Sequence, residues 1–150
     1  MDKEKNSEKK PFSVPKITDK EELAEIKKIV PRLDDDEKVH LVAKRIGELS
    51  VSGTIFVTNK RIIMVDSGIF EDLSYEQLSD ARLEEAHFSY TLVIKTRKLD
   101  ETMLALKRKM MQIHGQVEWK ENRGYIRGIP RNKGELLFKI VQYRIQETKT

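Results

Sequence analysis

Three histidines, His40, His87 and His114, are the side chains best suited to acid–base or metal chemistry near neutral pH. They lie far apart in the sequence and form neither an HExxH pattern nor another ligand spacing. The chain has no cysteine, which excludes thiol nucleophiles, thiolate metal sites and disulfides. It also has no GxSxG, phosphate-binding-loop or GxGxxG motif. We therefore expect a protein that is not an enzyme, with no catalytic residue, metal site, cofactor or small-molecule substrate.

Two clusters of charge could bind ions. Residues 34–37 read DDDE, but a calcium loop alternates its ligands, turns at a glycine and ends in a distal glutamate, so we expect a solvated loop. The Lys60-Arg61 pair could recognise phosphate. It follows Asn59 at the turn of a predicted hairpin, where charges keep the tip soluble, and we favour that interpretation.

Basic charge is concentrated in the last third of the chain. The net charge is +4, but residues 95–150 carry fourteen basic and six acidic side chains, a net charge of +8. An anionic partner should therefore meet this third of the chain. The candidate anion-binding patch is Arg97, Lys98, Lys107, Arg108, Lys109, Arg123, Arg127, Arg131 and Lys133, if these side chains face one way. The alternative is that they are scattered over a solvated surface.

The elements that must position these residues are mostly strands. Runs of β-forming residues at 54–58 and 61–65 flank Asn59-Lys60 and predict an antiparallel hairpin. Further strands are expected within 38–46, 81–86 and 90–96, with a short strand and a helical turn around residues 73–78 and a hairpin over 116–127. So many antiparallel strands favour a strongly bent sheet or a barrel. Helices are expected from a Thr18 cap to Pro31 and from about 132 to 146. We expect residues 1–17 to be a flexible tail and residues 18–150 to be a single domain.

A third predicted helix carries apolar residues at steps of four and three. Its face consists of Leu99, Met103, Leu106, Met110 and Ile113, an a/d seam of about two heptads. Asp100 can cap its start and Gly115 can close its end. The seam could pack on its own domain, pair with the same helix of a second copy, or lie on an anionic membrane.

The order of these elements resembles that of prokaryotic pleckstrin-homology-like (bacterial PH, GRAM-like) domains. The resemblance rests on the hairpin GTIFVTNKRIIMVDSG, the segment LSYEQLSDARLEE, the strand YTLVIKT and the helix after IRGIP. It implies a mainly β, α+β fold: a bent antiparallel sandwich or partly open barrel of about seven strands, capped by a C-terminal helix. The N-terminal helix precedes this fold, and residues 97–124 are then an insertion before the last strand.

The resemblance also implies a binding module. Lipid-binding members present basic residues around the loop between the first two strands, whereas the loop at 47–52 has none here, and only Lys44 and Arg45 precede it. We therefore predict a non-enzymatic interaction domain that binds a protein or associates with itself. The alternative is a peripheral binder of anionic lipid or, ranked lower, of nucleic acid, through residues 97–133. The expected location is cytoplasmic, with peripheral membrane association left open.

Overall fold

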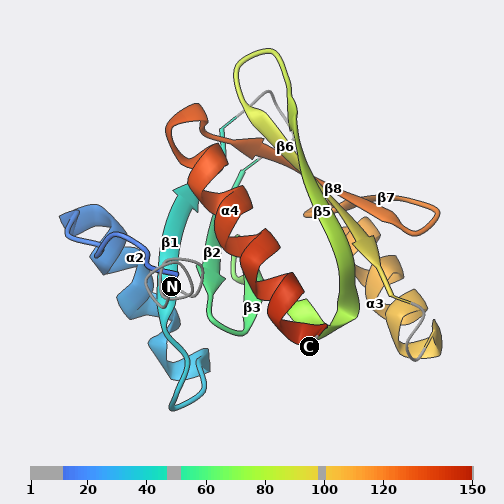
Figure 1. Cartoon of the computed structure of the whole chain (residues 1–150), viewed down its shortest axis with the longest axis horizontal. Helices are drawn as coiled ribbons and strands as arrows, with labels where there is room; N and C mark the ends of the chain where they lie inside the picture. Colours follow the sequence, from blue (N-terminus) through green and yellow to red (C-terminus); the bar gives the residue numbers. More distant parts are fainter. Residues whose placement is uncertain (1–11, 47–51, 98–100, 150) are drawn as a thin grey trace, which may run out of the picture.

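A computed structural model describes residues 12–46, 52–97 and 101–149 (Figure 1). Its elements are, in order, α2 (Lys20–Ile29), the 3₁₀ helix η1 (Val30–Arg32), β1 (Val39–Lys44), β2 (Thr54–Thr58), β3 (Arg61–Asp66), β4 (Ile69–Ser74), the 3₁₀ helix η2 (Tyr75–Gln77), β5 (Leu78–Glu85), β6 (Tyr90–Thr96), α3 (Glu101–His114), β7 (Glu118–Lys120), β8 (Arg123–Ile129) and α4 (Arg131–Thr148). The helices at both ends, the helix before the last hairpin and the succession of strands along the chain agree with the sequence prediction.

The strands form two antiparallel sheets of four. The first sheet has the order β1-β2-β3-β4 and the second the order β5-β6-β8-β7, with η2 between β4 and β5 at the corner. The predicted hairpin is confirmed, since Phe56 lies opposite Ile63 and Val57 opposite Ile62. The predicted bent sandwich is also confirmed. It has eight described strands instead of about seven. The hairpin expected over residues 116–127 is confirmed, since β7 and β8 pair antiparallel.

The first sheet is covered on both faces, which explains why every residue of β2 is buried. The main core lies between the sheets and α4, and includes Ile55, Met64 and Ile140. A smaller cluster on the other face joins Ile29 of α2 to Phe56 and Ile63. In α4 the buried face predicted from sequence is confirmed for Leu137, Ile140, Val141 and Ile145. Gly134 lets this helix approach closely, because a Cβ there would lie 2.1 Å from the ring of Tyr90.

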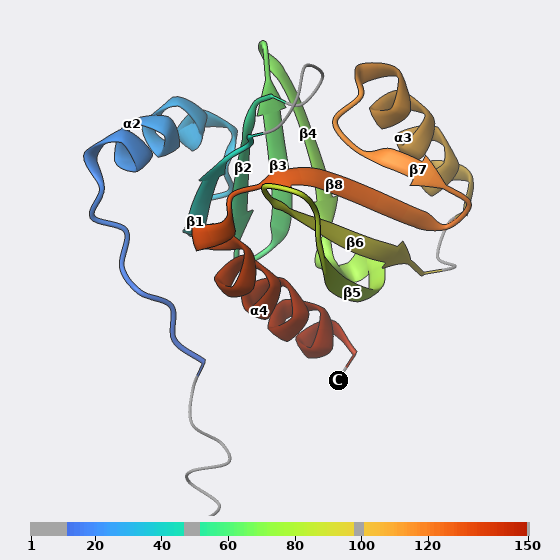
Figure 2. The same cartoon turned by 90° about the horizontal axis from the view of Figure 1, so that it is seen from above.

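The two helices that follow the central strands cover opposite openings of the sandwich. Figure 2 shows α4 along one side and α3 on the other, beside β7 and near β4. Val117 and Met111 join the main core, so the segment containing α3 is built into the domain. Gly115 ends α3 with a φ of 75°, as its place after the last apolar residue predicted.

The N-terminal region differs from the prediction in its details. Asp19, not Thr18, caps α2, since its side chain accepts a hydrogen bond from the Glu22 amide. Of the expected tail, residues 1–11 lie outside the described residues, whereas Phe12 stacks on Tyr143 of α4 at 4.3 Å between ring centroids. The loop at 47–51 also lies outside the described residues. None of the described helices is long and apolar enough to cross a bilayer.

Candidate functional site

The inner face of α3 fixes the helix to both sheets. Leu104 and Met111, seven residues apart, are 2% and 1% exposed. The Nζ of Lys107 lies 3.0 Å from a carboxylate oxygen of Asp72 in β4. Arg108 lies over the ring of Trp119 at 5.7 Å and donates to the Thr96 hydroxyl. These contacts fix which side of the helix faces away from the protein.

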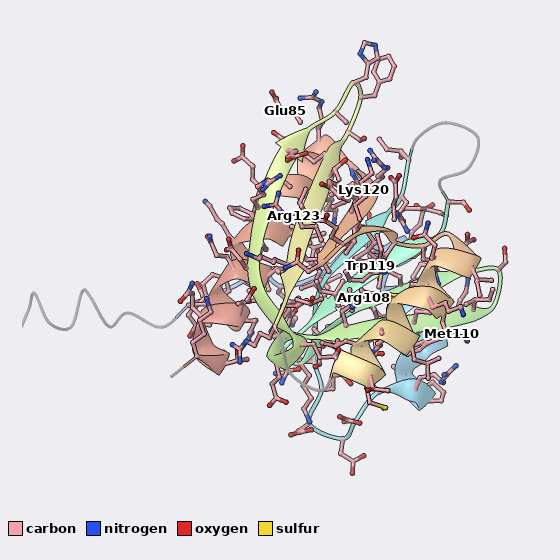
Figure 3. All side chains as sticks on the ribbon, turned by 90° about the vertical axis from the view of Figure 1, so that its right-hand side faces the viewer. Glu85, Arg108, Met110, Trp119, Lys120 and Arg123 are labelled. Carbon is pink, nitrogen blue, oxygen red and sulfur yellow. The ribbon has the colours of Figure 1, made fainter. Side chains whose placement is uncertain are left out.

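The outer face of α3 is the apolar seam predicted from sequence. Met103 and Leu106 are each 60% exposed, Met110 is 48% exposed and Ile113 is 69% exposed. Figure 3 shows Met110 on the outward side of the helix, with Arg108 and Trp119 further in. Leu99 lies outside the described residues. We call Met103, Leu106, Met110 and Ile113 the outer stripe. Among the described residues nothing covers the outer stripe, whereas the opposite face of the helix packs on its own domain through Leu104 and Met111.

Most of the candidate anion-binding residues have partners within the protein. Lys98 lies outside the described residues. Arg97 donates to the Leu78 carbonyl and the Thr148 hydroxyl. Arg127 pairs with Glu118, Arg131 with Glu85 and Lys133 with Glu22. Lys109 and Arg123 are exposed, and their side chains make no ion pair or hydrogen bond with the described residues.

Arg45, one of the two cations before the loop at 47–52, is turned into the protein. It is 9% exposed, and its guanidinium donates to the carbonyls of Arg127 and Gln116. Burial lowers the pKa of Arg45 to about 10. It holds β1 against β8, which leaves Lys44 as the exposed cation of this pair.

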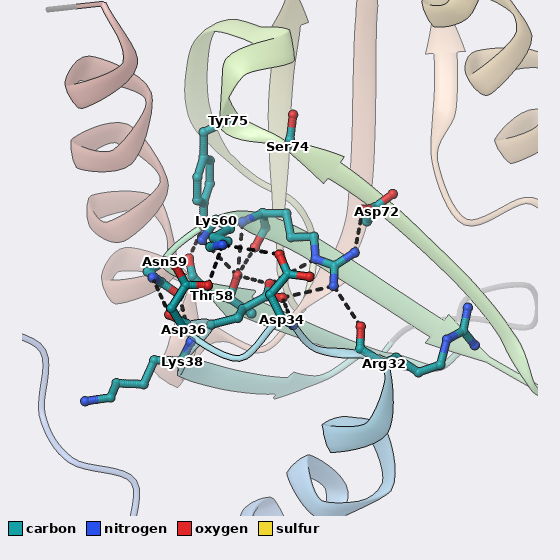
Figure 4. Close-up of polar contacts among 12 residues, drawn as sticks. Arg32, Asp34, Asp36, Lys38, Thr58, Asn59, Lys60, Asp72, Ser74 and Tyr75 are labelled. Carbon is teal, nitrogen blue, oxygen red and sulfur yellow. Dashed lines mark hydrogen bonds and ion pairs between the residues drawn. The ribbon is translucent and has the colours of Figure 1, made fainter.

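A network of ion pairs holds the tip of the β2–β3 hairpin (Figure 4). Arg61 donates to both carboxylate oxygens of Glu37 at 2.9 Å and to Asp72 at 2.8 Å. The Glu37 side chain is fully buried, so its expected position in a solvated loop is wrong. The reason is that Arg61, 24 residues away, and the Thr58 hydroxyl satisfy its carboxylate. We call Glu37, Arg61 and Asp72 the buried ion cluster.

Lys60 lies on the outside of this cluster. Its Nζ is 3.2 Å from a carboxylate oxygen of Asp34 and 2.6 Å from one of Asp36. Asn59 completes the turn by accepting a hydrogen bond from the Lys38 amide. Acidic side chains therefore neutralise both Lys60 and Arg61. The two cations stabilise the turn, and neither is available to bind a phosphate.

The buried ion cluster should make stability depend on pH. Burial would raise the pKa values of Glu37 and Asp72, but hydrogen bonds from Arg61 and other partners outweigh it and hold both below their ordinary values of 4.5 and 3.8. The stabilisation is therefore complete above about pH 4.5 and is lost as the pH falls through the lowered values. We expect the free energy of unfolding, measured in urea, to fall with pH below this point. Glu37→Gln should flatten the fall, and equal slopes would contradict the assignment.

Two exposed cations were missed in the sequence analysis. Lys95 on β6 lies opposite Arg123 on β8, and Lys120 on β7 lies opposite the same arginine. Each is an ordinary strand residue in the sequence. They become neighbours through the pairing register of β6, β8 and β7, which cannot be derived from the sequence alone.

The described residues contain no group of three or more His, Asp or Glu side chains that could hold a metal ion. The site is therefore best described as a surface: the outer stripe of α3, with exposed cations on the neighbouring β7–β8 hairpin.

Comparison with known proteins finds one family and a similar solved structure. Residues 33–114 match the family described as bacterial PH domain. A solved structure, a DUF1696 family protein with a pleckstrin-homology domain from Shewanella loihica PV-4, is similar with a TM-score of 0.39 and 20% sequence identity. The similarity covers 56% of this chain and 76% of that one. A search of curated proteins finds no match.

Proposed function

Because this chain belongs to the bacterial PH domain family, we propose that it is a non-catalytic binding module that associates with a second copy of itself through the outer stripe of α3. The observation that carries the proposal is the exposure of four large apolar side chains on one face of a helix whose opposite face is packed in the core. Exposed apolar stripes of this kind are typical of protein-binding surfaces.

The spacing of the outer stripe favours a second copy as the partner. The steps from Met103 to Leu106, Met110 and Ile113 are three, four and three residues, which read the same in both directions. A second α3 running antiparallel would therefore place Met103 opposite Ile113 and Leu106 opposite Met110. Two-fold pairing of one surface with itself is the commonest form of protein association.

The charges near the stripe give this association a distinctive salt dependence. Lys109 is the exposed charged residue beside the stripe in its central turn. Antiparallel pairing would bring it close to Lys109 of the second copy. Salt screens that repulsion, so the dimer should persist or tighten as salt is added. A helix that binds an anionic membrane through the same residues would show the opposite dependence.

The expected dimer is weak. A helix of 14 residues is ~21 Å long, and its exposed face supplies an interface below the ~1,200–2,000 Å² of a standard complex. We therefore expect dissociation constants on the order of micromolar.

Cysteine crosslinking tests the antiparallel pairing directly. The chain has no cysteine, so an introduced one is its only thiol. Lys109→Cys lies near the two-fold axis of the proposed dimer and should give a disulfide-linked dimer under mild oxidation, because the two Cβ atoms can approach within ~4.5 Å. Thr102→Cys is exposed near the start of the same helix, far from the axis, and should form no disulfide-linked dimer. Equal crosslinking at both positions, or none at either, would rule out the antiparallel dimer.

A further inference from the structure

The outward face of the second sheet carries three basic side chains in one row across the strands. Lys95 on β6 is paired in register with Arg123 on β8, and Arg123 is paired with Lys120 on β7. Directly opposed residues project to the same face of a sheet. That face is the outward one at this row, because all three basic side chains are exposed whereas Ile94 and Gly124, which face the other way, are buried. We call Lys95, Arg123 and Lys120 the basic row.

The side chains of the basic row form no ion pairs with the described residues, whereas other cations on the same face do. Arg82 pairs with Glu84 at 2.7 Å, and Arg127 pairs with Glu118 at 2.6 Å. The three side chains of the row are exposed and make no ion pair or hydrogen bond within the described residues. Asp80 lies opposite Lys95 in the register without forming an ion pair to it. Like charges placed opposite one another destabilise a sheet, so a bound anion would relieve a cost that the free protein carries.

We propose that the basic row binds the phosphodiester backbone of a single-stranded nucleic acid. Adjacent strands lie ~4.8 Å apart, so the row spans about 10 Å. The phosphates of an extended single strand are further apart than the ~3.4 Å per strand along a duplex axis, so such a strand presents about two phosphates over that length. A hollow of about 100 Å³ is lined by three cations, Arg82, Lys95 and Arg123, and by one carboxylate, that of Asp80, so its charged lining is basic overall. That volume exceeds the ~30 Å³ share of one water molecule and provides room for an anionic group.

The surroundings of the row favour nucleic acid over a lipid surface. The large apolar side chains exposed among the described residues lie on α2, α3, the end of β1 and the β5–β6 turn, so none projects from this face for insertion into a bilayer. Tyr125 lies in the next row of β8, and its partly exposed ring has Lys120 at 5.8 Å and Arg127 at 5.7 Å. A basic track beside an aromatic ring is the arrangement on which single strands bind, with bases stacking on the ring.

Fluorescence anisotropy of labelled oligonucleotides, one of RNA and one of DNA, tests the proposal on the whole chain. We expect Lys95→Glu/Arg123→Glu/Lys120→Glu to weaken binding at least about tenfold. It should also reduce the slope of log K against log salt by about 1.4, since each of two phosphates neutralised on a single strand adds ~0.7. The matched control Lys27→Glu/Lys44→Glu/Lys139→Glu makes the same change of net charge at exposed residues of α2, β1 and α4, and should change affinity by less than about threefold.

A second variant pair separates the ring from the charges. Tyr125→Phe should bind as the wild type does, whereas Tyr125→Ala should bind at least about fivefold more weakly, since stacking of one base contributes ~1–3 kcal/mol. Equal weakening by the two triple variants would overturn the proposal, as would wild-type protein that binds neither oligonucleotide. The proposal would also be overturned if Lys95→Glu/Arg123→Glu/Lys120→Glu kept its oligonucleotide binding but lost binding to phosphatidylserine vesicles. That result would assign the basic row to lipid. The Met103→Lys/Met110→Lys variant should still bind, so failure of the α3 dimer does not affect this test.

Discussion

Replacing Arg61 with leucine is expected to lower the free energy of unfolding by about 3–5 kcal/mol. The substitution leaves the fully buried Glu37 carboxylate without its cation and removes one of the two cations that face Asp72. An uncompensated buried charge costs far more than a surface pair, because water cannot replace the lost partner. Urea unfolding at neutral pH measures the loss.

Two controls isolate the buried charge as the cause. Lys60→Met removes the neighbouring cation, whose partners Asp34 and Asp36 are largely exposed, and should change stability much less. Glu37→Leu combined with Arg61→Leu should recover part of the loss, since it removes the unpaired carboxylate and leaves Asp72 with Lys107. If Arg61→Leu alone stayed within about 1 kcal/mol of the wild type, the buried ion cluster would not be a determinant of stability.

The Met103→Lys/Met110→Lys variant is expected to weaken self-association at least about a hundredfold. Each dimer would then hold four lysines in a seam that is apolar in the wild type, and burying unpaired charge is strongly unfavourable. The two methionines are 60% and 48% exposed in the single chain, so the fold itself should be unaffected. Sedimentation equilibrium over a concentration series gives the change in the dissociation constant.

The matched control for this variant lies on another helix. Leu23 and Val30 are exposed apolar residues at the N-terminal helix and its end, at 46% and 52% exposure. Leu23→Lys/Val30→Lys therefore adds the same charge at comparable sites without touching α3, and should associate as the wild type does. Met103→Leu/Met110→Leu keeps the stripe apolar and should also associate. Equal loss of association in both lysine variants would mean that α3 is not the interface.

Local patterns predicted the hairpins and helices well because their determinants lie close together in the sequence. The alternation around Asn59-Lys60 was enough to place β2 and β3. The heptad steps correctly grouped Met103, Leu106, Met110 and Ile113 on one face. Periodicity states which residues share a face, but not what covers it. The core-facing residues of α3, Leu104 and Met111, therefore emerged only from the structure.

Features that depend on pairing between distant segments could not be predicted. Glu37 belongs to an acidic segment whose composition is typical of a solvated loop. Only the fold brings Arg61 against its carboxylate. Lys95, Arg123 and Lys120 become neighbours only through the register of β6, β8 and β7. Counting basic residues along the chain located the excess of positive charge in residues 95–150. It did not separate Arg127, Arg131 and Lys133, which are paired with acidic residues, from Arg123, which is not.

Light scattering coupled to size exclusion, on the unmodified chain at low and high salt and at several concentrations, tests the central claim most directly. We expect the mass to rise with concentration toward twice that of one chain, and the dimer to persist or strengthen at high salt. A single-chain mass at every concentration and salt would contradict self-association through the outer stripe of α3. A dimer that dissociates at high salt would contradict it as well, since that dependence belongs to an interface held by charge.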